Sequence, residues 1–196
     1  MRNVQQQVPQ RGEMMLTSQR RKTTKDFDLL PEGKPYQLID GELIMSPSPV
    51  YEHQRVVREL STLLWTIVKQ GRLGEVIVAP IDIYVTEMDV FQPDIIFISH
   101  ERRSIIQDKI HGVPDLVIEV LSPPTAYYDL VHKKAVYEAS GVREYWIVDP
   151  KEQSVEVFLN TPTGFQAVAD ASRQGGVRSS IIEHFEVHLT ELFPRQ

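Results

Sequence analysis

Apolar residues recur three and four positions apart over one long segment of the chain. Within 52–70, valine, leucine and isoleucine follow a helical period, and Gly71 comes directly after the segment. This spacing places the apolar side chains along one face of a helix, and a glycine commonly ends a helix. The pattern therefore predicts an amphipathic helix over 52–70. A second, shorter helix is predicted over Asp129–Ala139, where Gly141 follows in the same way.

Short apolar segments predict strands around these helices. The segment 36–45, YQLIDGELIM, predicts a hairpin that turns at Asp40-Gly41, a dipeptide favoured in two-residue turns. Further strands are expected at 75–80, 81–86, 93–98, 115–122, 144–149 and 154–160, with weaker ones at 165–168 and 185–189. The order of these elements indicates an α/β or α+β fold, with a mixed central β-sheet flanked by helices.

The 196 residues suit one domain preceded by an arm. Residues 1–22 are rich in Gln, Arg, Ser and Thr and carry little apolar surface, so we expect them to form a disordered N-terminal arm. A short helix within 24–30 is expected at the start of a single domain that covers 23–196. The two tryptophans, Trp65 and Trp146, are expected to pack in its core.

The composition indicates where the protein is located and does not exclude a nucleic-acid partner. The chain has no cysteine, no apolar run long enough for a membrane span and no apolar start typical of a signal peptide. We therefore expect a soluble, cytoplasmic protein that does not bind membranes. The net charge of −6 does not exclude DNA, because phosphates are bound by local basic groups. Such groups occur at Arg20–Lys22, Arg102-Arg103 and Lys133-Lys134, and of the last pair Lys134 is expected to be solvated.

The segment 115–121, DLVIEVL, places a carboxylate inside an apolar strand. Alternation puts Glu119 on the face opposite Leu116, Ile118 and Val120. The nearly continuous apolar character indicates a central strand that is covered on both faces. An uncompensated buried carboxylate costs several kcal/mol. Glu119 should therefore have a cationic partner, which is either a metal ion or a basic side chain.

A second carboxylate, Asp94, opens the strand predicted at 93–98. An aspartate at the start of a strand is common in turns and carries little information alone. Two carboxylates on two strands of one sheet repel each other unless a divalent cation or a shared proton lies between them. Hard oxygen ligands of this kind suit magnesium or manganese. The pair Asp94 and Glu119 is therefore the expected metal site.

The second predicted helix carries the candidate basic partner. Asp129, Lys133 and Tyr137 are four residues apart and share one face of this helix. A lysine beside two carboxylates can neutralise them as a structural pair. In a hydrolase it can instead position a water molecule and stabilise charge that develops on a phosphate. The sequence leaves both roles open.

Several segments together resemble one protein family. The segments FQPDIIFIS, GVPDLVIEVLSP and YDLVHKKAVYEASGVREYWIVDP, with YQLIDGELIMSPSPVYEH upstream, are similar to the Uma-type putative restriction endonuclease family of the PD-(D/E)XK nuclease superfamily. The resemblance covers about 24–193. It implies a restriction-endonuclease-like core, in which two strands of a mixed sheet present metal ligands, and the hydrolysis of DNA with Mg²⁺ or Mn²⁺.

The resemblance also implies roles for individual residues. Asp94 corresponds to the motif aspartate and Glu119 to the second acidic ligand, and the main-chain carbonyl of Val120 is a further candidate ligand. Glu42, in DGEL, looks like the upstream acidic residue of the superfamily. The usual E-x-K pattern would place a lysine at 121, where this chain has Leu121.

Because of this departure, the resemblance makes Lys133 of the following helix the candidate catalytic lysine. His53, Asp129 and Tyr137 are expected to support the site around the ligands, and His53 is also a candidate phosphate contact. The predicted catalytic set is therefore Glu42, Asp94, Glu119 and Lys133.

The function expected from these observations is metal-dependent endonucleolytic cleavage of DNA by an activated water molecule. A homodimer is compatible with cutting both strands. Two alternatives remain at this point. The same fold can bind nucleic acid or protein without catalysis, with Lys133 neutralising the carboxylates, or the same acids can hydrolyse another phosphate ester with a metal.

Overall fold

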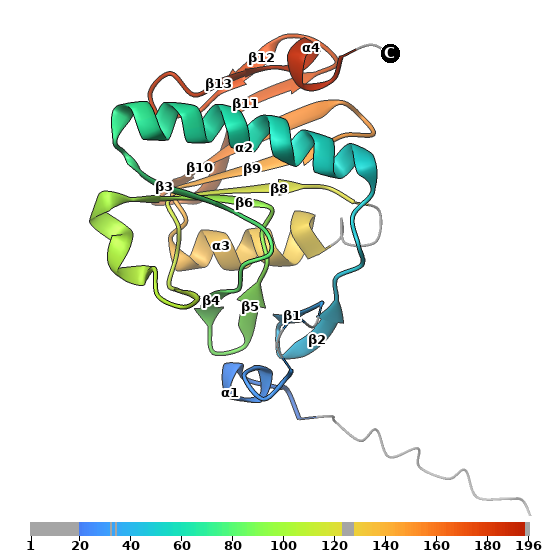
Figure 1. Cartoon of the computed structure of the whole chain (residues 1–196), viewed down its shortest axis with the longest axis vertical. Coiled ribbons are helices and arrows are strands. Elements are labelled where there is room, and N and C mark those ends of the chain that lie inside the picture. Colours follow the sequence, from blue (N-terminus) through green and yellow to red (C-terminus); the bar gives the residue numbers. More distant parts are fainter. Residues whose placement is uncertain (1–19, 32, 34, 123–127, 195–196) are drawn as a thin grey trace, which may run out of the picture.

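A six-stranded sheet forms the centre of the molecule (Figure 1). The computed structural model describes residues 20–31, 33, 35–122 and 128–194. The strands run in the order β11-β10-β9-β8-β6-β3. Their bounds are β3 (Gly74–Val78), β6 (Ile95–Ser99), β8 (Leu116–Val120), β9 (Glu144–Asp149), β10 (Ser154–Thr161) and β11 (Gly164–Ser172). β8 and β9 are parallel, whereas the other neighbouring pairs are antiparallel, so the sheet is mixed as predicted.

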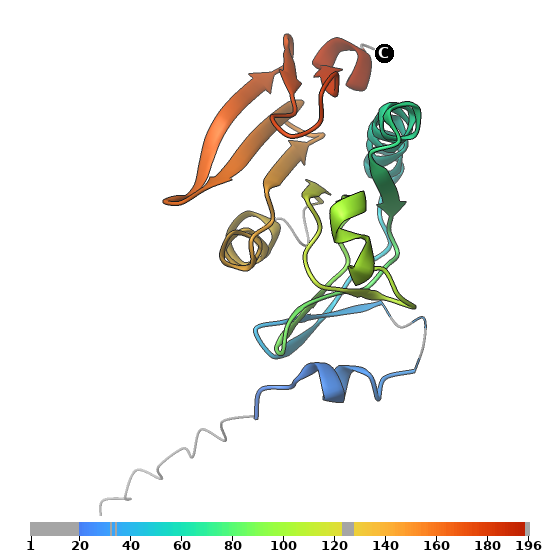
Figure 2. The same cartoon turned by 90° about the vertical axis from the view of Figure 1, so that its left-hand side faces the viewer.

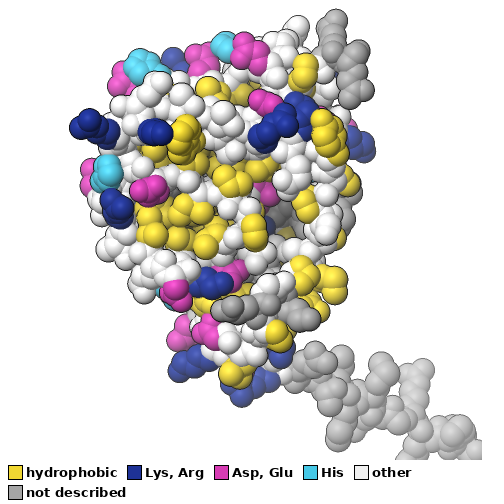
Figure 3. All heavy atoms as spheres, viewed as in Figure 1, with side chains coloured by type: hydrophobic (Ala, Val, Ile, Leu, Met, Phe, Trp, Pro, Cys, Tyr) yellow, Lys and Arg dark blue, Asp and Glu magenta, His cyan; other side chains and the backbone are white. Residues whose placement is uncertain are grey.

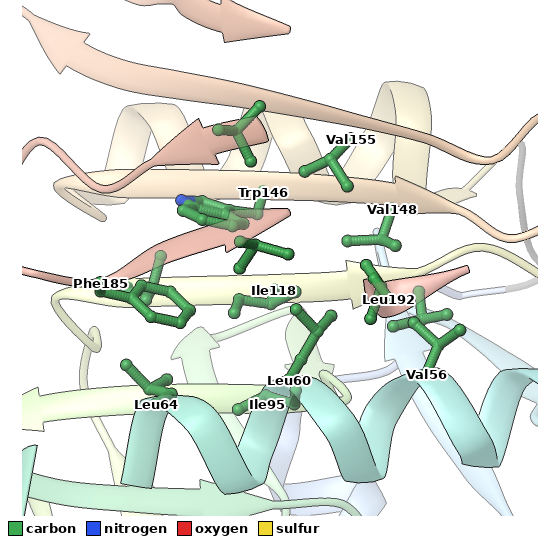
Figure 4. Close-up of a cluster of buried hydrophobic side chains, with 14 of the residues drawn as sticks. Val56, Leu60, Leu64, Ile95, Ile118, Trp146, Val148, Val155, Phe185 and Leu192 are labelled. Carbon is green, nitrogen blue, oxygen red and sulfur yellow. The ribbon is translucent and has the colours of Figure 1, made fainter. Parts of the chain in front are cut away.

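The helix α2 (Tyr51–Gly71) covers one face of this sheet (Figure 4). Its apolar side chains, among them Val56, Leu60 and Leu64, pack against alternate residues of the strands. Because these side chains recur every three or four residues, they form one continuous apolar stripe. The helix agrees with the predicted 52–70, but its C-terminal cap in the left-handed conformation is Arg72 (φ 51°) and not Gly71.

The opposite face of the sheet is covered by a π-helical turn, η2 (Tyr128–Lys133), which continues into α3 (Lys134–Ser140). Figure 2 shows the resulting layers, with α2 and α3 on opposite sides of the strands. α3 ends at Gly141, which adopts φ 88°, a conformation that glycine tolerates without strain. The predicted helix over 129–139 is therefore present, one residue longer at each end.

β8 lies inside the six-stranded sheet, and all five of its residues are buried. Leu116, Ile118 and Val120 belong to the core on the α2 side, whereas Val117 belongs to the core on the α3 side. The predicted alternation is therefore confirmed. It also fixes the direction of Glu119, which faces the helical segment η2–α3.

A second, smaller sheet has the strand order β2-β1-β5-β4-β7. Its strands are β1 (Tyr36–Ile39), β2 (Glu42–Met45), β4 (Ile83–Thr86), β5 (Asp89–Phe91) and β7 (Ile110–His111). The predicted hairpin is confirmed, with both Asp40 (φ 49°) and Gly41 (φ 76°) in the left-handed region at its turn. The sequence predicted one sheet because β5 and β7 are only three and two residues long, too short to show alternation.

The remaining elements include β12 (Gly176–Arg178) and β13 (Glu186–His188), which pair as a third, two-stranded sheet and contribute to the core on the α2 side. The others are α1 (Thr24–Phe27), the 3-10 turn η1 (His100–Ile105) and α4 (Leu189–Leu192). Residues 1–19 of the expected arm lie outside the described residues. Arg21 forms an ion pair with Asp40, and the Lys22 amide donates to the Gly41 carbonyl, so the end of the arm contacts the hairpin. In the described part of the chain no helix is long and apolar enough to cross a membrane.

The two tryptophans have opposite environments. Trp146 is fully buried on β9, where its ring stacks on Phe185 with 4.9 Å between the centroids (Figure 4). Trp65 is 49% exposed on α2, so its predicted place in the core is wrong. The period of α2 explains the difference, because Leu64 and Val68 occupy the buried face around Trp65 and direct its ring outward.

Candidate active site

Asp94 and Glu119 lie across from each other on two neighbouring antiparallel strands. The register pairs Ile95 of β6 with Ile118 of β8, which places the next residues, Asp94 and Glu119, at opposing positions. The amide of Val120 donates a hydrogen bond of 2.7 Å to Oδ2 of Asp94, which connects the two strands just beyond the end of β6. Pairing of the strands therefore brings the two predicted acidic residues together.

Glu119 is 2% exposed and binds two side chains of the helical segment η2–α3. Its Oε1 atom lies 3.0 Å from Nζ of Lys133 and accepts a hydrogen bond of 3.1 Å from the Tyr137 hydroxyl. Lys133 and Tyr137 reach the same oxygen because they are four residues apart, one helical turn. Lys133 is itself 2% exposed, so a buried ammonium compensates a buried carboxylate.

Asp94 is held from the opposite side of the sheet. Nε2 of His53, in the first turn of α2, lies 3.2 Å from Oδ1 of Asp94. His53 is buried, as it belongs to the stripe of α2 that faces the sheet. Asp94 therefore has partners on β8 and on α2, while Glu119 has partners on η2 and α3. The structure thus places His53 beside Asp94 and Tyr137 beside Glu119.

The four side chains Asp94, Glu119, Lys133 and His53 line one cavity of about 410 Å³. Its other walls come from β1 and the loop before it, from the segment between β2 and α2, from α2, from the end of β8 and from the chain after β3, β5 and β8. These walls consist of Gly33, Pro35, Gln37, Ser46, Pro47, Ser48, Pro49, Gln54, Ala79, Pro80, Gln92, Val120 and Ser122. The candidate site is thus an open hollow that joins both sheets to the start of α2.

A chain of amide hydrogen bonds in the wall of this cavity was not predicted. The main-chain N–H of Gln92 donates to Oε1 of Gln37 at 2.9 Å, and Nε2 of Gln37 donates to the Ser46 hydroxyl at 2.8 Å. The Gln92 side chain donates to Oδ1 of Asp82 at 2.7 Å. These bonds fix the β1–β2 hairpin beside Asp94. Gln92 directly precedes Pro93 and Asp94 in the sequence, whereas local patterning contains no signal for Gln37 and Ser46.

Glu42 does not lie with the other predicted site residues. It is exposed at the first position of β2, next to the turn of the hairpin, and pairs with Ile39. The cavity instead contains Ser46, which follows the other end of β2, about 13 Å away at the rise of a strand. The proposed place of Glu42 in the site is therefore corrected, because the direction of β2 carries it away from Asp94.

Three further residues singled out in the sequence, Asp129, Leu121 and Lys134, lie on or next to the strand and helix that carry the site. The side chain of Asp129 lies outside what the structure describes. Leu121 occupies the position of the lysine in the usual E-x-K pattern, and it packs in the apolar core on the α3 side. Lys134, expected to be solvated, is partly exposed: its Nζ lies 3.3 Å from the centre of the Phe158 ring, and burial lowers the pKa of this lysine.

The residues present can hold a hard divalent cation. Across the described ranges, no group of three or more His, Cys, Asp or Glu side chains is placed to bind a metal ion. Magnesium, however, usually binds proteins through one or two carboxylates and keeps water or substrate phosphates as its other ligands. The opposing carboxylates Asp94 and Glu119, which share one cavity, fit this donor set.

Comparison with known proteins places the chain among nuclease-like folds. The family model described as Uma2, "Putative restriction endonuclease", matches residues 24–187. A crystal structure titled as a putative nuclease belonging to DUF820, from Anabaena variabilis, has a similar fold with a TM-score of 0.73. The two chains are 22% identical over 87% of this chain and 97% of the other. No curated protein gives a significant match.

Proposed function

This chain belongs to the Uma2 family of putative restriction endonucleases, and on that premise we propose that it is a metal-dependent endonuclease that hydrolyses phosphodiester bonds of DNA. One observation carries the proposal. Two carboxylates on neighbouring strands, Asp94 and Glu119, open into the same cavity as the buried Lys133. A hydrolase acting on a phosphodiester needs acidic metal ligands and a nearby cation, and this cavity brings both together.

Asp94 and Glu119 would hold a magnesium or manganese ion, with the main-chain carbonyl of Val120 as a further candidate ligand. When bound, such an ion supplies an activated water molecule and neutralises negative charge on a phosphate. Val120 also donates its amide to Asp94, and His53 contacts the other carboxylate oxygen, so the orientation of Asp94 is set before substrate binds. Preorganised ligands of this kind avoid reorganisation during the reaction.

In this proposal, Lys133 stabilises negative charge on the phosphate. Its ammonium lies 3.0 Å from Glu119 and lines the cavity, so it can donate to an oxygen of a phosphate bound there. A fixed cation is most effective in a site from which water is largely excluded, because the effective dielectric constant is low. Tyr137 is buried behind Glu119 and positions its carboxylate without facing the substrate.

A second candidate function follows from the same contacts. Glu119 is compensated by Lys133, and Asp94 is bound by Val120 and His53, so both carboxylates have partners within the protein. A non-catalytic module that binds nucleic acid or protein would need nothing more. The two functions differ in metal dependence, because an ion pair between Lys133 and Glu119 has no need of magnesium.

The deciding experiment measures cleavage of supercoiled plasmid and of single-stranded oligonucleotides with Mg²⁺ or Mn²⁺. The variant is Asp94→Asn, and the matched control is Asp170→Asn, which removes an exposed carboxylate on β11. We expect metal-dependent cleavage by the wild type and the control, and its loss in Asp94→Asn. Calorimetric titration of Mg²⁺ into the same three proteins supplies a readout that is independent of turnover.

Two results would redirect the assignment. Absence of both cleavage and Mg²⁺ binding in the wild type would favour the non-catalytic module. Hydrolysis of bis(p-nitrophenyl) phosphate together with intact plasmid and oligonucleotides would indicate a different metal-dependent phosphoesterase.

A further inference from the structure

The outward side of α2 carries a stripe of related side chains. Its members are Tyr51, Gln54, Arg58, Thr62, Trp65 and Lys69, and all six are exposed. They follow one another at intervals of three or four residues, so they form one line along the helix, opposite the apolar stripe that faces the sheet. We call this line the α2 stripe.

The chemistry of the α2 stripe differs from that of the whole chain. It combines two aromatic rings and two cations with an amide and a hydroxyl, and none of its six members is acidic, in a chain with a net charge of −6. The acidic residues of α2, Glu52 and Glu59, lie roughly 100° around the helix axis from the stripe. Figure 3 shows basic side chains over both ends of α2 on this face of the molecule.

The two aromatic rings of the stripe are open to solvent. Tyr51 is 76% exposed and Trp65 is 49% exposed. Nζ of Lys69 lies 4.2 Å from the centre of the Trp65 ring, so a cation and an aromatic face are presented together. Arg58 forms an exposed ion pair with Glu59 at 2.6 Å. Exposed pairs contribute little to stability, so Arg58 can exchange Glu59 for a phosphate at low cost.

The stripe is continuous with the candidate active site. Gln54 lines the cavity that contains Asp94, and Tyr51 lies one turn before it on the same side of the helix. At its other end the stripe reaches a second hollow, lined by Trp65, Lys69, Arg72 and His100 among others. Glu75 also lines that hollow and lies 3.7 Å from Arg103. From Tyr51 to Lys69 the helix spans about 27 Å.

Building on the proposed function, we propose that the α2 stripe binds an unpaired DNA strand that leads away from the cleavage site. Tyr51 and Trp65 stack on bases, while Arg58 and Lys69 pair with phosphates. Aromatic rings alternating with cations suit single strands, because only unpaired bases expose their faces for stacking. A rigid helix about 27 Å long accommodates roughly eight stacked nucleotides at about 3.4 Å each. The substrate is therefore DNA with a single-stranded segment next to the scissile bond.

The test measures equilibrium binding in EDTA, so that cleavage does not contribute. Fluorescence anisotropy of a labelled 20-nucleotide oligothymidylate is compared with that of a hairpin duplex for Tyr51→Ala and Trp65→Ala. Tyr51→Phe and Trp65→Phe keep the rings. Leu63→Ala is the matched control, as Leu63 is exposed on another side of α2. Each alanine variant should bind the oligonucleotide at least fivefold more weakly. The phenylalanine variants and the control should stay within twofold of the wild type.

Two further readouts are specific to the stripe. Because Trp146 is fully buried, quenching of tryptophan fluorescence by the oligonucleotide should come from Trp65 and should disappear in Trp65→Phe. Lys69→Gln should reduce the slope of log affinity against log salt concentration by about one.

Three outcomes would overturn the inference. Oligonucleotide binding by Trp65→Ala and Tyr51→Ala equal to that of Leu63→Ala would exclude a role for the two rings. Tighter binding of the duplex than of the oligonucleotide would reject an unpaired strand. A change in oligomeric state of Trp65→Ala, with unchanged oligonucleotide binding, would assign the stripe to a contact with a second copy of this chain. Loss of cleavage in Asp94→Asn with normal oligonucleotide binding separates this inference from the proposed function.

Discussion

The two ends of β8 carry buried carboxylates in different surroundings. Asp115, which precedes the strand, is 1% exposed and accepts a hydrogen bond of 2.7 Å from the Ser99 amide. Arg143 and Arg102 approach its other oxygen at 3.3 and 3.5 Å. Glu119, near the end of the same strand, is equally buried but opens into a cavity beside Lys133.

Burial alone therefore does not separate a structural carboxylate from a candidate catalytic one. Asp115 connects the end of β6 to the start of β9, and its two arginines extend to the surface. It therefore has the character of a structural connection. Glu119 combines a buried cation with access to a hollow that an external ligand can enter. Access, together with a charged partner, is what distinguishes the candidate catalytic end of β8.

The largest expected contrast between the two ends is in cleavage. Glu119→Gln keeps the shape of the side chain but removes its charge, and we expect the cleavage rate to fall by about 100-fold to 1,000-fold, as for the loss of a principal electrostatic group. Asp115→Asn should stay within a few-fold of the wild type. Rates on supercoiled plasmid in Mg²⁺ provide the comparison. Equal losses in both variants would remove the distinction between the two ends.

The next contrast concerns stability. Lys133→Met leaves Glu119 buried without its cation, and removing one partner of a buried pair typically costs about 3–5 kcal/mol. Urea denaturation in EDTA measures this loss, and Mg²⁺ should restore part of it by binding the uncompensated carboxylate of Glu119. The double variant Lys133→Met, Glu119→Gln should recover much of the stability. A Lys133→Met protein as stable as the wild type would show that the ion pair contributes little.

Asp115→Asn should lower stability by less than Lys133→Met. The loss of charge weakens its contacts with Ser99 and the arginines, and hydrogen bonds to charged groups contribute about 1.5–3 kcal/mol. The arginines are partly exposed and can be solvated instead, so we expect about 2 kcal/mol in urea denaturation. Mg²⁺ should not change this value. Rescue of Asp115→Asn by Mg²⁺ would contradict its assignment as a purely structural carboxylate.

The smallest expected effect tests how Glu119 is positioned. Tyr137→Phe removes one hydrogen bond to Oε1 of Glu119, and we expect a loss of about 1 kcal/mol in stability. Because Lys133 still contacts the same oxygen, cleavage should fall only several-fold, mainly through turnover and not through the Michaelis constant. A loss as large as that of Glu119→Gln would give Tyr137 a direct part in the reaction.

The elements of the fold were predictable where a local period decides them. α2 and β8 follow their hydrophobic patterns closely, and the turn at Asp40-Gly41 follows from its backbone requirements. The separation of the five-stranded sheet from the six-stranded sheet was not predictable, because strands as short as β5 and β7 depend on long-range partners. The exposure of Trp65 was missed because a large apolar side chain was assigned by type and not by its phase in the helix.

The candidate site was predictable where a charged residue interrupts an apolar strand. Asp94 and Glu119 stood out as acids at apolar strands, and the spacing of Lys133 and Tyr137 predicted a shared face that the contacts with Glu119 bear out. Glu42 was misplaced because the direction of a hairpin relative to another sheet is not encoded locally. The amide chain through Gln37 and Ser46 requires two distant segments to meet, which no local pattern reveals.

The lysine that faces Glu119 is carried by a helix and not by the strand itself. In an E-x-K strand, the glutamate and the lysine are two residues apart, so the geometry of the strand fixes the distance between them. In this chain thirteen residues separate Glu119 from Lys133, and helical phase decides whether the ammonium arrives. One residue inserted between Tyr128 and Lys133 would change the position of the lysine around the helix axis and turn it away from Glu119. The charge balance of this site is therefore vulnerable to small insertions and deletions that leave every charged residue in place.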